Sequence, residues 1–166
     1  MSNTLIDLTS QEDFDLNDLP ERVSFAPWPK GIYECTVDEF AEETQEYADG
    51  NLVPGYIFKV TLNRVVSVAP DTGLEDLPSE EANQSWFFPK VGKDDKGTKR
   101  CLGEIRNLLM PFGKALGSTK FSEVSPWVKN QPVTLVTDLY IKTRDDGTTR
   151  GYSNIVTVYV GHFQGD

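Results

Sequence analysis

The sequence predicts a mainly β fold: a small barrel of five strands with one helix between the third and fourth strands, preceded by an acidic N-terminal arm. Two observations predict it. Apolar and polar residues alternate with a period of two in several separate segments, and one later segment changes to the spacing of three and four that marks an amphipathic helix. The chain has 166 residues, which suits one domain with an extension.

Residues 1–29 predict the arm, residues 30–162 the barrel domain and residues 163–166 a short tail. The arm mixes acidic residues with scattered apolar residues that keep no regular period. This pattern is typical of a segment that docks on another surface instead of packing a core of its own. The apolar residues are Leu5, Ile6, Leu8, Phe14, Leu16 and Leu19.

The first half of the barrel domain contains three alternating segments. In order, the sequence predicts a strand at 31–40, an acidic loop or extended hairpin end at 41–55, a strand at 56–68, a loop at 69–83 and a strand at 83–91. The second strand alternates most clearly, so that Lys59 falls on the face opposite Phe58 and Val60. Consecutive aromatic residues at 86–88 cannot all point inward, and the alternation leaves open which of them point out.

The second half begins with the helix. Apolar residues from Cys101 to Leu116 recur at spacings of three and four, with Thr98 as the predicted N-cap and Gly117 as the predicted end. A connector that holds a helical turn follows, and then strands at 132–144 and 151–161 around an Asp-Asp-Gly turn. This order matches the oligonucleotide/oligosaccharide-binding (OB) barrel, although other α+β arrangements also fit.

Charge is divided unevenly along the chain. The formal net charge is −10, with two basic and thirteen acidic side chains in residues 1–50, against twelve basic and eight acidic in residues 90–166. Such asymmetry is typical of a nucleic-acid-binding protein with an acidic arm, and a solvated acidic face with no partner is the alternative.

No catalytic or metal-binding pattern stands out. Cys35 and Cys101 form no CxxC pair and are expected to be buried free thiols, and His162 is the only histidine. There is no glycine-rich phosphate loop, no apolar stretch of membrane-spanning length and no signal-like N-terminus. We therefore expect a non-enzymatic cytoplasmic protein with no cofactor, no metal and no membrane partner.

Basic and aromatic residues gather on three segments that the OB barrel brings together, namely strands two and three and the hairpin of strands four and five. Single-strand binders neutralise phosphates with lysine and arginine and stack bases on aromatic rings. The predicted phosphate contacts are Lys59, Lys90, Lys93, Lys99, Arg100, Lys142, Arg144 and Arg150. The predicted stacking residues are Trp86, Phe87, Tyr140 and Tyr152.

The motifs PKGIYECTVDEFAEET, YIFKVTLNRV, SWFFPKVG, LGEIRNLLMPFGKALG, VSPWVKNQPVTLVTDL and YSNIVTVYV span roughly residues 29–161. Their layout resembles a family of small tailed-bacteriophage proteins, often grouped only as a domain of unknown function. That family is similar to phage single-stranded DNA-binding proteins with an OB-like barrel, from replication and recombination modules. The resemblance implies no catalytic residue, and a host-cell cytoplasmic location. Two features depart from it: the acidic segment stands at the front of this chain, and residues 41–55 are acidic.

The sequence thus predicts a sequence-tolerant single-stranded DNA-binding protein. The acidic arm would compete for the DNA groove or recruit replication or recombination proteins, and copies of the chain could associate. One alternative is a non-enzymatic protein-interaction module whose acidic arm binds a host or phage partner. Another is a metal-dependent nuclease, which would need at least three acids converging beside a lysine. A continuous positive stripe across strands two and three favours DNA, whereas scattered lysines favour the interaction module.

Overall fold

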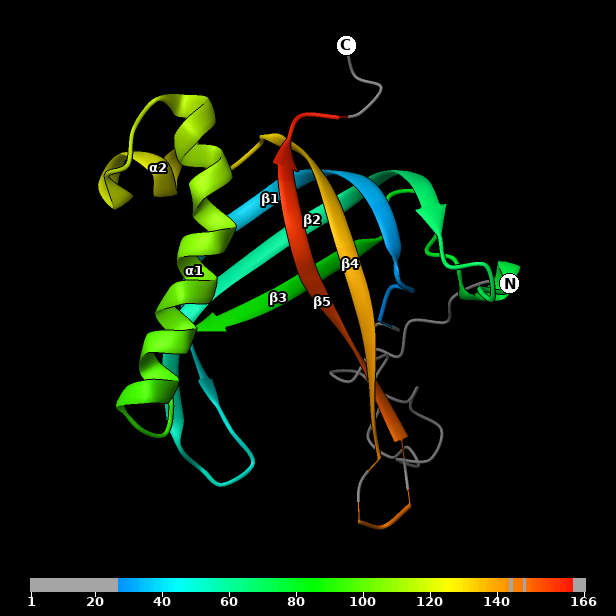
Figure 1. The fold of residues 1–166 in the computed structure, drawn as a ribbon, viewed down its shortest axis with the longest axis horizontal. Coiled ribbons are helices and arrows are strands. Elements are labelled where there is room, and N and C mark those ends of the chain that lie inside the picture. The colour runs from blue at the N-terminus through cyan, green and yellow to red at the C-terminus, as the bar shows by residue number, and fades with distance from the viewer. Residues whose placement is uncertain (1–26, 144, 148, 163–166) are drawn as a thin grey trace, which may run out of the picture.

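The structure is a computed structural model that describes residues 27–143, 145–147 and 149–162. Within them, five antiparallel strands form one sheet in the order β3-β2-β1-β4-β5 (Figure 1). Along the chain both α-helices come between β3 and β4, and a short 3-10 helix, η2 Leu74–Asp76, comes between β2 and β3. The strands are β1 Gly31–Glu46, β2 Leu52–Val68, β3 Asn83–Pro89, β4 Pro132–Thr143 and β5 Thr149–Val160, and the α-helices are α1 Asp95–Leu116 and α2 Phe121–Trp127. The predicted mainly β, OB-like architecture is confirmed.

The first hairpin is longer than a loop at residues 41–55 would allow. β1 and β2 pair from Gly31 opposite Val68 to Glu46 opposite Leu52, so the extended hairpin end is the alternative that the structure adopts. Its turn is closed by two hydrogen bonds, from the Tyr47 N–H to the Asn51 carbonyl and from the Gly50 N–H to the Tyr47 carbonyl, with Gly50 at a positive φ of 85°. Acidic residues disfavour strands by propensity, but here several of them lie on solvent-facing positions.

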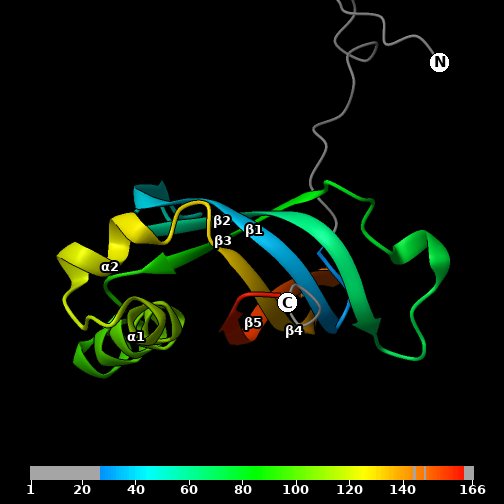
Figure 2. The same ribbon diagram turned by 90° about the horizontal axis from the view of Figure 1, so that it is seen from above.

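The sheet folds over on itself around one core. Figure 2 shows β1, β2 and β3 in one layer and β4 and β5 in a second, with both helices at one end. Trp86 on β3 donates its indole N–H to the carbonyl of Ser153 on β5 at 3.0 Å and so links the two edge strands. Such a link, together with α1, helps close a barrel that has no β3–β5 ladder within the described residues.

Helix α1 covers one end of the core. Its apolar stripe, which includes Ile105, Leu108 and Phe112, is buried, and Gly117 ends it in the left-handed conformation as predicted. The N-cap is Asp94 and not the predicted Thr98, because the Asp94 carboxylate accepts the Gly97 N–H at 2.7 Å. No helix in the described part of the chain is long and apolar enough to cross a membrane.

The packed core begins ahead of β1. Trp28 is buried against Tyr33 and Trp86, with ring centroids 4.8 and 6.1 Å away. The carbonyl of Pro29 accepts hydrogen bonds from the hydroxyls of Tyr33 and Thr137. The core therefore includes Trp28, two residues before the predicted start of the barrel domain. Most of the predicted arm and the whole predicted tail lie outside the described residues.

Both cysteines are free thiols. Cys35 is buried in the core, as predicted, and burial raises the pKa of its thiol. Cys101 is only half-buried, on α1. His162 lies near the core, with Nε2 3.0 Å from the Cys35 carbonyl oxygen.

Candidate nucleic-acid interface

The outer surface of β2 and β3 carries two of the predicted site residues. Phe58 and Val60 on β2 face the core and are fully buried, so the exposed Lys59 between them faces out. On β3, Trp86 lies opposite Phe58 and Phe87 lies opposite Ile57. The alternation therefore places Phe87 on the same outer surface as Lys59.

The Phe87 ring leans along the sheet instead of standing away from it. A Cβ atom at Gly55 would lie only 2.7 Å from Phe87 Cζ, so the ring tip occupies the space above the Gly55 backbone. Phe87 also helps cover Ile57, whose side chain is on the same face and only 6% exposed. Phe87 is partly exposed, and a partly exposed aromatic ring on this surface is a candidate platform for base stacking. No sequence pattern marks Gly55, because its role depends on the β2–β3 register.

Lys59 lies among polar and acidic neighbours. Its Nζ is 4.0 Å from Glu39 Oε2, and both side chains are about half exposed. One step along the same face, the Thr61 hydroxyl is 2.6 Å from Asp38 Oδ2 and 2.9 Å from Asn83 Oδ1. The carboxylates of Asp38 and Glu39 on β1 thus lie against a threonine and a lysine.

Trp86 was predicted as a stacking residue, and the structure places it largely against the core. Its ring packs against Phe58 and Trp28 at the core, with centroids 6.2 and 6.1 Å away. Its indole N–H donates a hydrogen bond to the Ser153 carbonyl. These contacts hold much of the ring against the core, and Trp86 is only partly exposed. Of the two adjacent aromatic residues, Phe87 is the one that faces out.

Lys90 lies on the opposite side of the β3 strand from Phe87. Its Nζ is 3.2 Å from Glu42 Oε2 and 4.7 Å from the centre of the Tyr56 ring. The hydrogen bond to Glu42 raises the pKa of Lys90. Because this lysine already has a carboxylate partner away from the outer surface, it does not join Lys59 and Phe87.

Lys93, Lys99 and Arg100 follow β3 in the turn before α1 and in its first two turns. All three are exposed, and none forms an ion pair within the described residues. Burial, and next the electrostatic effect of Cys101 on α1, raise the pKa of Tyr47 in the turn of the β1–β2 hairpin. These cations therefore form a group of their own beyond the end of β3.

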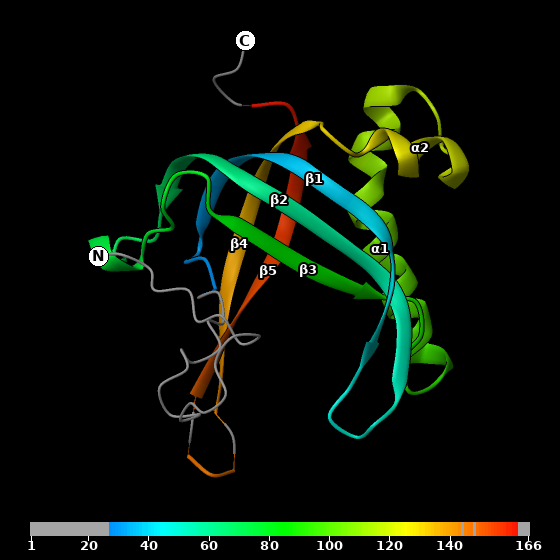
Figure 3. The same ribbon diagram turned by 180° about the vertical axis from the view of Figure 1, so that it is seen from behind.

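The β4–β5 hairpin carries the remaining predicted residues. Tyr140 and Tyr152 lie directly opposite each other, with ring centroids 6.5 Å apart and side chains 54% and 37% exposed. Lys142 lies on the same face, opposite residue 150. The Arg150 side chain and the whole of Arg144 lie outside what the structure describes. Figure 3 shows this hairpin and the β1–β2 hairpin projecting in the same direction, on either side of β3.

The predicted cations thus form several groups and no continuous stripe across β2 and β3 within the described residues. Only Lys59 shares the outer surface with Phe87, and by the criterion set out above this scatter favours the interaction module. The described residues also contain no group of three or more His, Cys, Asp and Glu side chains that could hold a metal ion.

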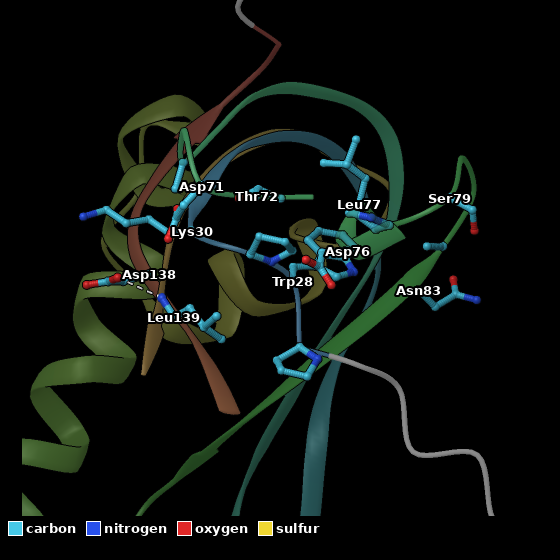
Figure 4. Close-up of a pocket in the computed structure, with 15 residues that line it drawn as sticks. Trp28, Lys30, Asp71, Thr72, Asp76, Leu77, Ser79, Asn83, Asp138 and Leu139 are labelled. Atoms are coloured by element: carbon cyan, nitrogen blue, oxygen red, sulfur yellow. Dashed lines mark hydrogen bonds between the residues drawn. The ribbon is translucent and has the colours of Figure 1, made fainter. Parts of the chain in front are cut away.

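A separate cavity of about 700 Å³ opens beside Trp28 and the β2–β3 loop (Figure 4). Asp71, Asp76 and Asp138 are among its lining residues, whereas Lys30 is the single cationic residue there. This excess of acidic side chains disfavours phosphate binding, so we do not include the cavity in the candidate interface.

No protein-family model matches the chain, and no curated protein matches it. Among solved structures, the chain is similar to a structure of yeast RPA bound to ssDNA, at 11% sequence identity. The match covers 89% of this chain and 84% of that chain, with a TM-score of 0.30. A likeness at this TM-score carries no argument about function, which has to come from the geometry above.

Proposed function

We propose that this chain is a sequence-tolerant single-stranded DNA-binding protein without catalytic activity, of the type used in phage replication or recombination. One observation carries the proposal: the Phe87 ring lies across Gly55 beside Lys59, on the outer surface of β2 and β3. In OB barrels this surface and the adjoining hairpins hold oligonucleotides. A ring platform tolerates any sequence, because every base has a π-face. The phage setting rests on the sequence resemblance.

The exposed pair of Tyr140 and Tyr152, with Lys142 beside it, is the proposed second contact on the DNA. Arg144 and Arg150 continue the same hairpin in the sequence. The DNA strand would contact Lys93, Lys99 and Arg100 beyond the other end of β3. Because the described cations are spread out and Lys59 has an acidic neighbour, we expect modest affinity with a clear dependence on salt.

A fluorescence-anisotropy titration with a labelled oligo-dT at two salt concentrations tests the proposal. We expect binding at low salt that weakens at higher salt, as phosphate neutralisation requires. Phe87→Ala should lower the affinity by roughly 5- to 150-fold, because stacking contributes about 1–3 kcal/mol per base. Leu74→Ala, which removes an 86% exposed apolar side chain on the β2–β3 loop, should leave the affinity unchanged. No binding at low salt would refute the proposal.

The protein-interaction module is the second candidate, and the ion pairs favour it. Lys59 and Lys90 both have carboxylate neighbours, Glu39 and Glu42, which reduce their attraction for phosphate. In this case the barrel serves as a scaffold and the acidic arm engages a host or phage protein. The same titration separates the two candidates, because the interaction module requires no affinity for oligo-dT.

A further inference from the structure

We propose that residues 1–26 of one copy of this chain dock on the helical corner of a second copy, so that copies associate head to tail. The helical corner is the segment from the last turn of α1 to the residues just after α2, residues 113–130. The helical corner lies away from Phe87 and Lys59, so the proposed association does not depend on DNA binding.

The corner presents aromatic surface that the sheet holds in place. Phe121, at the start of α2, is 46% exposed and its ring centroid lies 5.5 Å from that of Tyr56 on β2. Tyr56 in turn stacks on Phe40 of β1, with centroids 5.0 Å apart and planes 15° from parallel. A row of rings therefore runs from β1 to α2 and ends at an exposed phenylalanine. Because these rings are already ordered, a ligand loses less free energy on binding than it would by ordering a mobile surface.

The charge of the corner itself, residues 113–130, is positive. Lys114, Lys120 and Lys129 are exposed in the corner, whereas Glu123 is its only acidic residue and accepts a hydrogen bond from Ser118 at 2.7 Å. The ion pairs of the described residues join Lys59 to Glu39, Arg64 to Glu34 and Lys90 to Glu42. None of the three corner lysines has a carboxylate partner among them. The corner therefore fits a segment that is both acidic and apolar.

Residues 1–26 of this chain have that composition. They contain six acidic residues and one basic residue, Arg22, together with scattered leucine, isoleucine and phenylalanine side chains. The acidic groups match the corner lysines, and the apolar side chains match Phe121 and the partly exposed Leu116. This complementarity of charge and apolar surface identifies the occupant.

The two surfaces lie on different sides of the molecule. The described chain begins at Pro27, whose Cγ lies 3.1 Å from where a Cβ of Gly151 would be, on the β4–β5 hairpin. In Figures 1 and 3 this hairpin and α2 lie on opposite sides of the barrel. An interface between two different surfaces of identical chains is heterologous and extends into open chains unless the rotation closes a ring. Because 26 extended residues reach roughly 90 Å, an arm could also reach its own corner, and the experiment must separate the two cases.

Sedimentation velocity without DNA tests the proposal with complementary variants. The full chain should form species larger than a monomer, increasingly at higher protein concentration and less at higher salt. A chain without residues 1–26 has an intact corner but no arm to dock. A Lys114→Glu, Lys120→Glu, Lys129→Glu variant has the arm, but its corner has lost the positive charge that the arm needs. Each should be monomeric alone. Their mixture should form a 1:1 dimer and nothing larger, because only one interface is available.

Lys96→Glu is the matched control, since it reverses one exposed charge at the other end of α1, about 27 Å along the helix axis from Lys114. It should associate like the full chain. Circular dichroism shows whether each variant keeps its fold. The proposal is wrong if the full chain stays monomeric, as docking within one copy would require. It is also wrong if removal of residues 1–26 leaves association unchanged, or if the mixture of folded variants stays monomeric.

Discussion

Trp86 and Phe87 are neighbours on β3, and the pleat of the strand directs their side chains to opposite faces of the sheet. The Trp86 ring fills the space between Phe58 and Trp28 and links β3 to β5 through Ser153, whereas Phe87 lies on the outer surface. Trp86→Ala should lower the free energy of unfolding by about 3–5 kcal/mol, as for other large core truncations. Phe87→Ala should lower it by less, and urea denaturation measures both. Equal losses would mean that Phe87 is a core residue and no platform.

Tyr33 makes the stability of the fold sensitive to alkaline pH. Burial, and next the charge of the Cys35 thiolate, raise the pKa of Tyr33 from 10.0 to about 12. The folded state thus holds the phenol proton more tightly than the unfolded state does. The resulting stabilisation is fully present below pH 10 and is lost as the pH rises from 10 to 12.

The measurement is the free energy of unfolding of the wild-type chain and of Tyr33→Phe across this window. The wild-type value should fall by up to about 2–3 kcal/mol more than that of the variant, since each pKa unit corresponds to about 1.4 kcal/mol. The lost hydrogen bond to Pro29 adds an offset that does not change with pH. If the free energies of unfolding of the two proteins changed equally with pH, Tyr33 would not be the source of the pH dependence.

Some site residues could be predicted at this scale and others could not. Lys59 lies in the most regular alternation of the sequence, and its outward direction follows from the strand period alone. Three consecutive aromatic residues have no such phase, so the sequence left the choice between Trp86 and Phe87 open. The ion pair of Lys90 could not be predicted, because a pattern shows a charge but not its partner, and Glu42 comes from another strand.

At the scale of elements, the pairing of β2 with β3 depends on a glycine. A Cβ at Gly55 would lie 2.5 Å from the Phe88 carbonyl oxygen and 2.7 Å from Phe87 Cζ, and the first of these is backbone that cannot move aside cheaply. We therefore expect Gly55→Ala to destabilise the fold by about 1–3 kcal/mol, in the range of overpacking substitutions. It should also weaken DNA binding, because the added methyl group displaces the Phe87 ring.

Gly103 on α1 provides the matched control, because a Cβ there would have no neighbour within 4 Å. Gly103→Ala should stabilise the fold by about 0.5–1 kcal/mol through the higher helix propensity of alanine. Thermal or urea unfolding of both variants tests the pair. Stabilisation by Gly55→Ala would show that the Phe87 ring does not need the space above Gly55.

The order and type of the elements could be predicted because each carries its own period. Their ends could not, since ends depend on local hydrogen bonds. The helix starts three residues before Thr98 because Asp94 caps it, while the Thr98 hydroxyl instead accepts the Gly92 N–H at 3.0 Å. The acidic end of the β1–β2 hairpin was left open between a loop and a strand, since composition there disagrees with the pairing that tertiary structure imposes.

For the whole molecule, the architecture was easier to predict than the distribution of charge. The barrel follows from the order of elements, which is a property of the sequence. The charge around Phe87 depends on which acidic residues other strands bring close, such as Glu39 beside Lys59. The total of −10 therefore says little about the surface of β2 and β3, and the contribution of residues 1–26 has to be measured separately.

Removing residues 1–26 should tighten the binding of oligo-dT at low salt. These residues carry six acidic and one basic side chain, and they join the described chain beside the β4–β5 hairpin at Pro27 and Gly151. At an assumed distance of about 15 Å from one phosphate in water, each of five net negative charges would contribute about 0.3 kcal/mol of repulsion. Together they amount to about 1.4 kcal/mol, or roughly a tenfold change in affinity.

Salt screens this repulsion, because the Debye length falls from about 30 Å at 0.01 M to about 8 Å at 0.15 M. The gain on truncation should therefore be large at the lower salt concentration and nearly absent at the higher one. Anisotropy titrations at protein concentrations low enough to avoid association measure it. A full-length variant with the six acids changed to Asn or Gln should match the truncated chain, because charge and not chain length is responsible. If truncation leaves the low-salt affinity unchanged, the acidic residues do not compete with DNA, and their partner lies elsewhere.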